Sequence, residues 1–256
     1  MLENNIPKKF ISFLLQKFSR IVFFVYRVIN YIKFHTTPIE FKNQLPKKSQ
    51  LEKKIYDNVA DEMFENFKDH FKRSLLMVSG DQMRDYAIQT SLLNDKNNEH
   101  YYLEFGVYKG GTANYFSKHV KKLYAFDSFE GLSEDWIGKG APKGTFNLNK
   151  KIPKLNSNVE PIIGWVEDTL DDFLKKHNPK INFVHMDFDI YSPTKFTLKK
   201  LKPFLIKNSI IIFDNMINYP GWQEGEYKAL NEVFNENEFD YKAFRVNRKQ
   251  CIVQIR

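Results

Sequence analysis

The sequence is poor in cysteine and in long apolar runs, and these two shortages exclude several classes of protein. Cys251 is the only cysteine, so an internal disulfide is impossible and a disulfide-stabilised secreted domain is excluded. The longest apolar run of the N-terminal segment covers residues 21–26, far short of the roughly 20 residues that span a membrane. Lys17 and Arg20 interrupt this region, and no small-residue cleavage site follows, which argues against a secretory signal peptide. We expect a cytoplasmic protein.

The chain also lacks a broad basic surface outside its N-terminal part. Lys and Arg outnumber Asp and Glu by 39 to 31, but residues 1–54 hold nine Lys and two Arg against three Glu. The other 202 of the 256 residues therefore balance, and charge does not indicate nucleic acid as a partner of the main domain. A hydrophobic content of 42%, with 24 Phe, is enough for one substantial core plus an appendage.

The N-terminal part, residues 1–35, predicts an amphipathic basic helix. On a helical wheel, apolar residues such as Phe10 and Leu14 gather on one side, and basic residues such as Lys9 and Arg27 lie on the other. Such a helix suits peripheral contact with an anionic membrane surface. It equally suits docking on the core of the protein or on a second subunit, and the sequence leaves both open.

Three segments follow from these patterns. The membrane contact, if made, would involve residues 8–34. Residues 36–74 predict a polar basic linker and a cap helix at residues 51–71 that covers the active site. From residue 75 to residue 256 short apolar runs alternate with helical patterns, as in βαβ units with a parallel sheet.

This alternation predicts an α/β fold of Rossmann-like type, with a mainly parallel seven-stranded sheet and an antiparallel C-terminal strand. The predicted strands are residues 101–105, 122–126, 159–163, 181–186, 209–213, 244–246 and 251–254. The predicted helices are residues 83–94, 112–118, 169–176, 193–205 and 225–235.

A glycine-rich turn follows the first predicted strand. Its glycines, Gly106, Gly110 and Gly111, are spaced G-x-x-x-G-G, unlike the G-x-G-x-x-G of dinucleotide-binding turns. Glu104 stands directly before the turn, where a carboxylate would repel a phosphate. It suits a cationic ligand instead, such as the amino group and sulfonium of S-adenosylmethionine. Taken alone, such a turn could be an ordinary strand-to-helix connection.

Two later strand ends support a nucleoside ligand. Asp127 comes 23 residues after Glu104 at the end of the second strand, where an acid can accept hydrogen bonds from both ribose hydroxyls. Trp165, after the third strand, could stack on adenine, and Asp168 could accept from its exocyclic amine. Open α/β sheets bind ligands at these carboxyl ends.

Acids also end the next two strands. Asp187, Asp214 and Asn215 offer oxygen ligands of the kind that Mg²⁺ prefers, and Asp189 could act as a general base. Each acid alone could instead cap a helix or loop. His185 reads as a structural strand residue.

In order and spacing, residues 104–111, 127–132, 164–170, 187–194 and 213–215 resemble the macrocin O-methyltransferase (TylF-like) family of class I S-adenosylmethionine-dependent methyltransferases. The resemblance implies a Mg²⁺-dependent O-methyltransferase that acts on a sugar hydroxyl, often in a natural product, and that assembles as a homo-oligomer. One position departs from the family pattern, since the family usually places Asp where this chain has Asn215. An Asp-Asn pair there is similar to the metal site of catechol O-methyltransferases.

The resemblance and the residue patterns together give the expected site. The expected S-adenosylmethionine contacts are Glu104, Gly106, Val107, Tyr108, Gly110, Gly111, Thr112, Asp127, Ser128, Trp165, Asp168 and Asp187. The expected catalytic residues are Asp187 and Asp189, the expected metal ligands Asp187, Asp214 and Asn215, and the expected substrate contacts Arg84, Tyr191 and Trp222.

Three functions stay open at this stage. The first is methylation of a sugar hydroxyl in a glycan or glycosylated metabolite. The second keeps the site but takes a catechol or other phenol, because aromatic residues such as Tyr191 and Tyr219 can pack against either acceptor. The third is a non-catalytic protein at the membrane periphery, since a fold alone does not fix function.

Overall fold

A computed structural model describes residues 49–256, so the helix predicted at residues 1–35 and most of the linker lie outside the described part. Lys54–Arg256 forms one compact unit. Among the described residues, no helix has both the length and the apolar character needed to cross a membrane.

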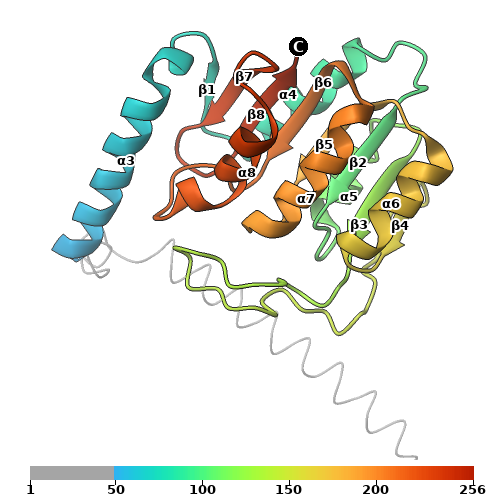
Figure 1. Cartoon of the computed structure of the whole chain (residues 1–256), viewed down its shortest axis with the longest axis horizontal. Helices are drawn as coiled ribbons and strands as arrows, with labels where there is room; N and C mark the ends of the chain where they lie inside the picture. The colour runs from blue at the N-terminus through green and yellow to red at the C-terminus, as the bar shows by residue number, and fades with distance from the viewer. Residues whose placement is uncertain (1–48) are drawn as a thin grey trace, which may run out of the picture. The chain divides into compact units, whose positions relative to one another are not determined.

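The core of this unit is one eight-stranded sheet (Figure 1), in the order β1-β7-β8-β6-β5-β2-β3-β4. Neighbouring strands are parallel except around β8, which is antiparallel to both β6 and β7. The strands are β1 (Leu75–Met77), β2 (Tyr101–Phe105), β3 (Leu123–Asp127), β4 (Val159–Ile163), β5 (Ile181–Met186), β6 (Leu205–Phe213), β7 (Phe239–Arg245) and β8 (Cys251–Ile255).

The predicted α/β class, with its mainly parallel sheet and antiparallel C-terminal strand, is confirmed. The sheet has eight strands and not seven because β1 adds an edge strand beside β7. This strand has only three residues, and Leu75 and Leu76 are exposed, so it carries no inside-outside alternation that a sequence pattern could reveal.

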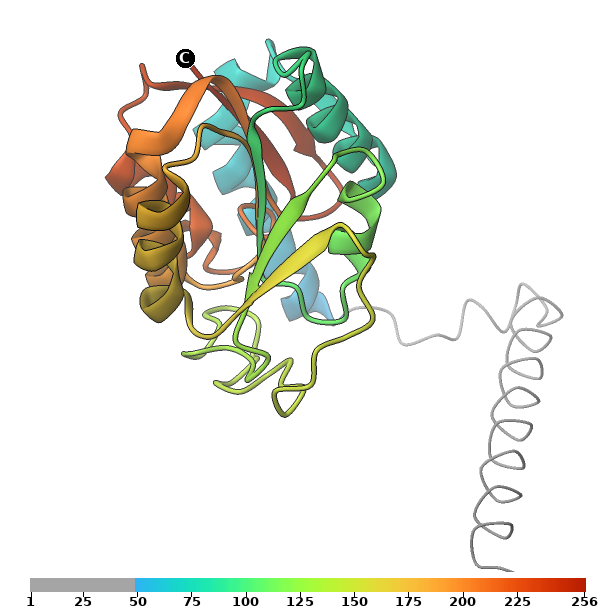
Figure 2. The ribbon, with the colours of Figure 1, turned by 90° about the vertical axis from the view of Figure 1, so that its right-hand side faces the viewer.

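Helices cover both faces of the sheet (Figure 2). Side chains of α3, α6, α7 and α8 join one core cluster, and those of α4 and α5 join the other. The helices are α3 (Gln50–Phe71), α4 (Gly80–Leu93), α5 (Gly111–Phe116), α6 (Val166–His177), α7 (Tyr191–Leu201) and α8 (Glu226–Val233), with short 3₁₀ helices at Lys202–Phe204 and Trp222–Glu224.

The cap helix forms as predicted, but it does not cover the site. Phe67 of α3 is fully buried, with its ring centroid 5.6 Å from that of Trp222 and 5.1 Å from that of Phe244. Burial of one such ring contributes about 1.5–3 kcal/mol. No residue of α3 between 54 and 71 lines the main cavity described below, so this helix serves the core at the β7 side of the sheet.

The strand order brings the functional strand ends to one edge. Beyond the ends of β5 and β6, the amide of Asp187 donates to the carbonyl of Phe105 at 2.9 Å, and the amide of Asp214 donates to that of Met186 at 3.0 Å. These bonds extend the parallel ladder into the loops, so the side chains that follow the strands start from fixed backbone positions.

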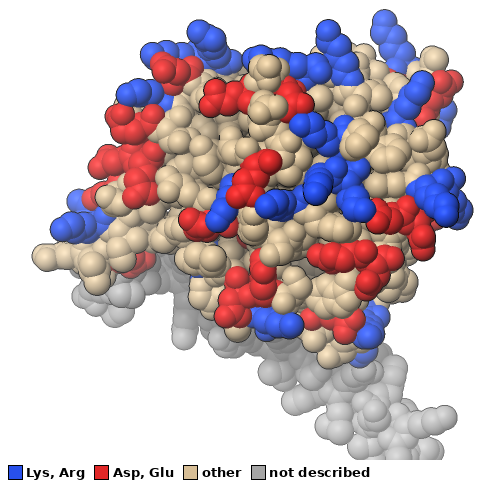
Figure 3. Space-filling view, in the orientation of Figure 1, with Lys and Arg blue, Asp and Glu red and all other residues tan. Residues whose placement is uncertain are grey.

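Charged residues on the surface of the unit are mixed. On the face shown in Figure 3, acidic and basic side chains lie interspersed over the described residues. This is the usual distribution of a solvated surface.

Candidate active site

The main cavity has a volume of about 310 Å³ and lies at the carboxyl ends of the parallel strands. Two groups of residues in its wall matter here. The first group, called the donor side because the methyl donor is expected there, consists of Gly106, Asp127, Ser128 and Trp165. The second group, called the acidic edge, consists of Asp187, Asp189, Asp214 and Asn215. Other wall residues include Tyr108, Leu132, Ser133, Trp136, Phe146, Glu167, Phe188 and Lys249.

Asp127 organises the donor side. Its Oδ2 accepts from the amides of Val107 and Tyr108 at 2.7 and 2.8 Å, and its Oδ1 accepts from the amide of Phe129 at 2.6 Å. A carboxylate has about four lone-pair sites, so Asp127 can hold the glycine turn and still accept from a ligand in the cavity.

Gly106 joins the donor side to the acidic edge. Its φ is +86°, and a Cβ at this position would lie 2.0 Å from the carbonyl oxygen of Asp187. Only glycine allows this close approach of two strand ends. The close packing of the ends of β2 and β5 therefore requires glycine at position 106.

Glu104 does not form the wall of the cavity. Its side chain is fully buried, accepts a hydrogen bond from the Thr112 hydroxyl, and lies 3.0 Å from Nδ1 of His185. Both of these contacts use Oε1, whereas Oε2 is buried and has no hydrogen-bond partner among the described residues. The expected contact of Glu104 with a cationic ligand stays a prediction.

His185 connects Glu104 to the acidic edge, and sequence reasoning gave it only a structural role. Burial by itself would lower the pKa of the imidazole, but the carboxylates of Asp214 and Glu104 outweigh burial and raise the pKa well above its usual value.

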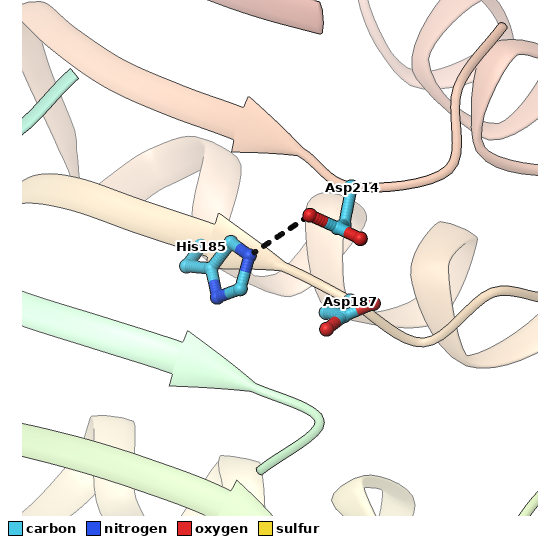
Figure 4. Close-up of side chains that lie close together, drawn as sticks. All are labelled: His185, Asp187 and Asp214. Atoms are coloured by element: carbon cyan, nitrogen blue, oxygen red, sulfur yellow. Dashed lines mark ion pairs between the residues drawn. The ribbon is translucent and has the colours of Figure 1, made fainter. Parts of the chain in front are cut away.

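Three side chains of this region converge (Figure 4). One ligand atom each from His185, Asp187 and Asp214 lie within 4.8 Å of one another. Burial, the largest cause, and the nearby Asp214 charge raise the pKa of Asp187 well above its usual value. Burial opposes ionisation of Asp214 too, yet the nearby charge of His185 and the hydrogen bond from Gln250 keep its pKa below the usual value. The strand ends thus meet as expected.

The side chains at the acidic edge fit a divalent cation in part. Asp187 and Asp214 fit, since two carboxylates face one point and Nε2 of His185, fully buried, has no hydrogen-bond partner among the described residues. Asn215 fits less well as it stands. Its Nδ2 donates to Asp187 Oδ1 at 3.1 Å, and its Oδ1 accepts from the ammonium of Lys249.

Asp189 has an unusual backbone and environment. Its φ of 66° falls in the left-handed region of the backbone map, which residues other than glycine rarely adopt. Backbone strain of this kind clusters at functional sites. The side chain is buried, and burial raises its pKa to about 7 against the opposing charge of Lys249.

A second cavity, of about 210 Å³, shares Trp136, Asp189 and Ile190 with the main cavity. Tyr191, an expected substrate contact, lies in its wall with Tyr219. Other residues of this wall are Glu134, Ser192, Glu224 and Lys228. Asp189 thus borders both spaces.

Several expected contacts lie elsewhere. Asp168 is exposed outside the main cavity, and its neighbour Glu167 lines the wall instead. Arg84 pairs with Asp81 on α4 at 2.5 Å and lines neither cavity. Trp222 is fully buried in the core, so it has no surface to offer a substrate.

The remaining expected residues fall into two groups. Gly106, Tyr108, Asp127, Ser128, Trp165, Asp187, Asp189, Asp214 and Asn215 line the main cavity. Val107, Gly110, Gly111 and Thr112 lie in the turn and first helical residues behind it, outside the wall.

Sequence reasoning missed Lys249, Trp136 and Glu226. Lys249 enters from the turn between β7 and β8, and Glu226 begins α8 and accepts from the amide of Asn215 at 2.9 Å. Burial raises the pKa of Glu226 well above its usual value. None of the three follows a strand end in the pattern that revealed the acids, so no local signal marked them.

The region that forms this site is similar to known methyltransferases. Residues 103–216 match the family model described as a methyltransferase domain. Calicheamicin methyltransferase CalS11 has a TM-score of 0.56 at 19% identity, covering 81% of this chain and 94% of that one. The apo structure of CalS11, named a TDP-rhamnose 3′-O-methyltransferase, has a TM-score of 0.50 at 20% identity, with 81% and 96% covered. The O-methyltransferase NovP has a TM-score of 0.50 at 18% identity, with 68% and 78% covered. No curated protein matches.

Residues 103–216 thus match a methyltransferase domain, and the solved structures share the fold of this chain. At these identities the solved structures show the fold alone. The finer resemblance to the macrocin O-methyltransferase family lies beyond what this match tests and stays a prediction.

Proposed function

We propose that the chain is an S-adenosylmethionine-dependent O-methyltransferase whose acceptor is a sugar hydroxyl of a glycan or glycosylated metabolite. The observation that carries the proposal is the position of Asp189, which borders both the main cavity and the second cavity. A carboxylate between a donor space and an acceptor space can take the proton that methyl transfer to oxygen releases.

The main cavity is the proposed donor site. When bound, S-adenosylmethionine supplies a methyl group on a positively charged sulfonium. Asp127 would accept from the ribose hydroxyls with the lone pairs left free by the turn, and Trp165 offers a ring for the adenine. The excess of carboxylates over cations at the acidic edge favours a cationic ligand.

In the proposed reaction the acceptor oxygen bonds to the methyl carbon, the carbon–sulfur bond breaks with its electrons on sulfur, and the hydroxyl proton leaves. Asp189 is the proposed proton acceptor. Its buried position makes it a stronger base than a solvated carboxylate, and its backbone fixes the side chain at the boundary of the two cavities.

A divalent cation is part of the proposal. Asp187 and Asp214 would hold Mg²⁺, with Nε2 of His185 close by. A metal in such a site lowers the pKa of a coordinated hydroxyl.

The second cavity is the proposed acceptor site. Trp136, Tyr191 and Tyr219 give it aromatic walls, and Glu134 and Lys228 add polar groups to these walls. Rings with adjacent carboxylate and ammonium groups suit a sugar, which packs its C–H face and hydrogen-bonds its hydroxyls. The similar protein CalS11, seen in two structures, is named a TDP-rhamnose 3′-O-methyltransferase in one of them, which supports a sugar.

The test is methyl transfer from labelled S-adenosylmethionine to a panel of sugars and nucleotide sugars, run beside a panel of catechols and phenols, with and without Mg²⁺. Label in a sugar product, found by mass analysis, supports the proposal. Label only in phenols replaces the acceptor class, and no transfer with no S-adenosylmethionine binding rejects the enzyme.

Two further expectations concern partners. We propose that residues 8–34 contact an anionic membrane surface and that the chain assembles as a homo-oligomer. The basic and apolar composition of the segment supports the first. Liposome flotation of the chain with and without residues 1–40 tests it, and equal flotation rejects it.

A further inference from the structure

Lys249 lies in the turn between β7 and β8, and its ammonium group reaches the acidic edge of the main cavity. Nζ donates to Oδ1 of Asn215 and lies 4.2 Å from the centroid of the Trp136 ring. The carbonyl of Lys249 accepts from the amides of Met216 and Ile217 at 3.0 and 3.1 Å. The aromatic ring and the two backbone bonds therefore hold the ammonium beside the amide.

The partners of Asn215 fix the orientation of its amide. Nδ2 donates to Oδ1 of Asp187 at 3.1 Å and to Oδ1 of Asp189 at 2.5 Å, while Oδ1 faces Lys249. A metal ligand would have to present Oδ1 to an ion beside Asp187 and Asp214, because the NH₂ group of an amide has no lone pair to offer. Turning the amide over would bring that NH₂ group against the ammonium, donor against donor.

Lysine and a divalent cation thus require opposite orientations of the same amide. They also compete electrostatically, because each supplies positive charge to the same carboxylates. A second observation points to a cation site here: Nε2 of His185, fully buried and without a hydrogen-bond partner among residues 49–256, lies 3.9 Å from Oδ1 of Asp214.

We propose that Lys249 is a built-in competitor of the divalent cation: it withholds Asn215 from the metal and keeps the metal affinity of the acidic edge low. The inference rests on the metal site of the proposed function. Release of the ammonium from Asn215 would complete the ligand set, so the identity of residue 249 sets how strongly this site binds metal.

The test is Mn²⁺ binding to the full chain, followed by the loss of the free-ion electron paramagnetic resonance signal. Three proteins are compared: wild type, Lys249→Met and Lys139→Met. Lys139 is a matched control, since its Nζ lies 5.7 Å from the same Trp136 ring centroid, but it is exposed and has no hydrogen bond to Asn215. Lys249→Gln keeps a polar side chain without charge and provides the same test if the Met variant does not fold.

Lys249→Met should tighten Mn²⁺ binding about tenfold or more, Lys249→Gln by a smaller factor, and Lys139→Met by less than about twofold, as expected for loss of one nearby charge and one donor. Equal affinity in all proteins, absence of binding in every one of them including Lys249→Met and Lys249→Gln, or equal tightening by the two Met variants would overturn the proposal. S-adenosylmethionine binding is measured in parallel without metal. Its failure counts against the proposed function, while unchanged Mn²⁺ affinity with normal S-adenosylmethionine binding counts against Lys249 alone.

Discussion

The donor side and the acidic edge of the main cavity are built by different means. Asp127 on the donor side is held by backbone amides, those of Val107 and Tyr108 in the glycine turn and that of Phe129 two residues further on. The acidic edge is held by side chains from distant elements, such as Lys249 on Asn215 and His185 between two carboxylates. The donor side depends on the backbone geometry of two adjacent loops, and the acidic edge depends on a charge balance between side chains of several elements. Substitutions in the two regions should therefore have different effects on catalysis and on ligand binding.

The largest effect is expected at the acidic edge. Asp189→Asn removes the proposed proton acceptor and keeps the side-chain shape, so kcat should fall by about 10²–10⁴-fold, while S-adenosylmethionine affinity stays within about threefold of wild type. Steady-state methyl transfer and equilibrium binding measure the two quantities. A loss of binding as large as the loss of rate would place Asp189 on the donor side and erase the distinction.

The contact that joins the two regions should be nearly as sensitive. Gly106→Ala places a Cβ 2.0 Å from the Asp187 carbonyl oxygen at a φ of +86°, and we expect a loss of about 3 kcal/mol in the free energy of unfolding. Urea denaturation measures it. Gly111→Ala is the control, because a Cβ there meets nothing within 4 Å. Similar stability of both variants would show that the strand ends are not packed as described.

A smaller effect is expected on the donor side. Asp127→Asn removes a charged acceptor from the turn and the cavity, so the dissociation constant for S-adenosylmethionine should rise about 10–100-fold, the loss expected for hydrogen bonds to a charged group. Quenching of tryptophan fluorescence, with Trp165 in the cavity wall, follows binding. Asp172→Asn, an exposed acid on α6, serves as the control and should bind as wild type.

The smallest effect distinguishes two neighbours. Glu167 lines the cavity and Asp168 does not, so Glu167→Gln should weaken binding about threefold and Asp168→Asn should leave it unchanged, on the scale of one exposed hydrogen bond. The same fluorescence titration reports both. A larger loss of binding in Asp168→Asn than in Glu167→Gln would support Asp168 as the adenine contact.

Much of the fold could be predicted because its strands are short, buried and bounded by turns. The predictions for β2, β4 and β5 agree with the observed bounds. The helix predicted at residues 193–205 ends at Leu201 instead, because a 3₁₀ turn at Lys202–Phe204 leads the chain into β6 at Leu205. An edge strand as short and exposed as β1 has no periodicity to detect.

Residues of the site could be predicted from the sequence only where they directly follow the end of a strand. Parallel strands place their carboxyl ends at one edge, so the meeting of Asp187 and Asp214 follows from their sequence positions. Lys249 lies 34 positions after Asn215, in the turn between two antiparallel strands, and no spacing rule connects the two residues. The enclosure of Glu104 by His185 and Thr112 likewise depends on packing that the sequence pattern does not contain.

Calorimetric titration of the full chain with S-adenosylmethionine tests the central claim most directly, run on wild type, Asp127→Asn and Asp189→Asn. We predict one site per chain in wild type, the same site at nearly the same affinity in Asp189→Asn, and a clearly weakened site in Asp127→Asn. No heat of binding in wild type, or equal losses in the two variants, would contradict the assignment of the main cavity to the methyl donor.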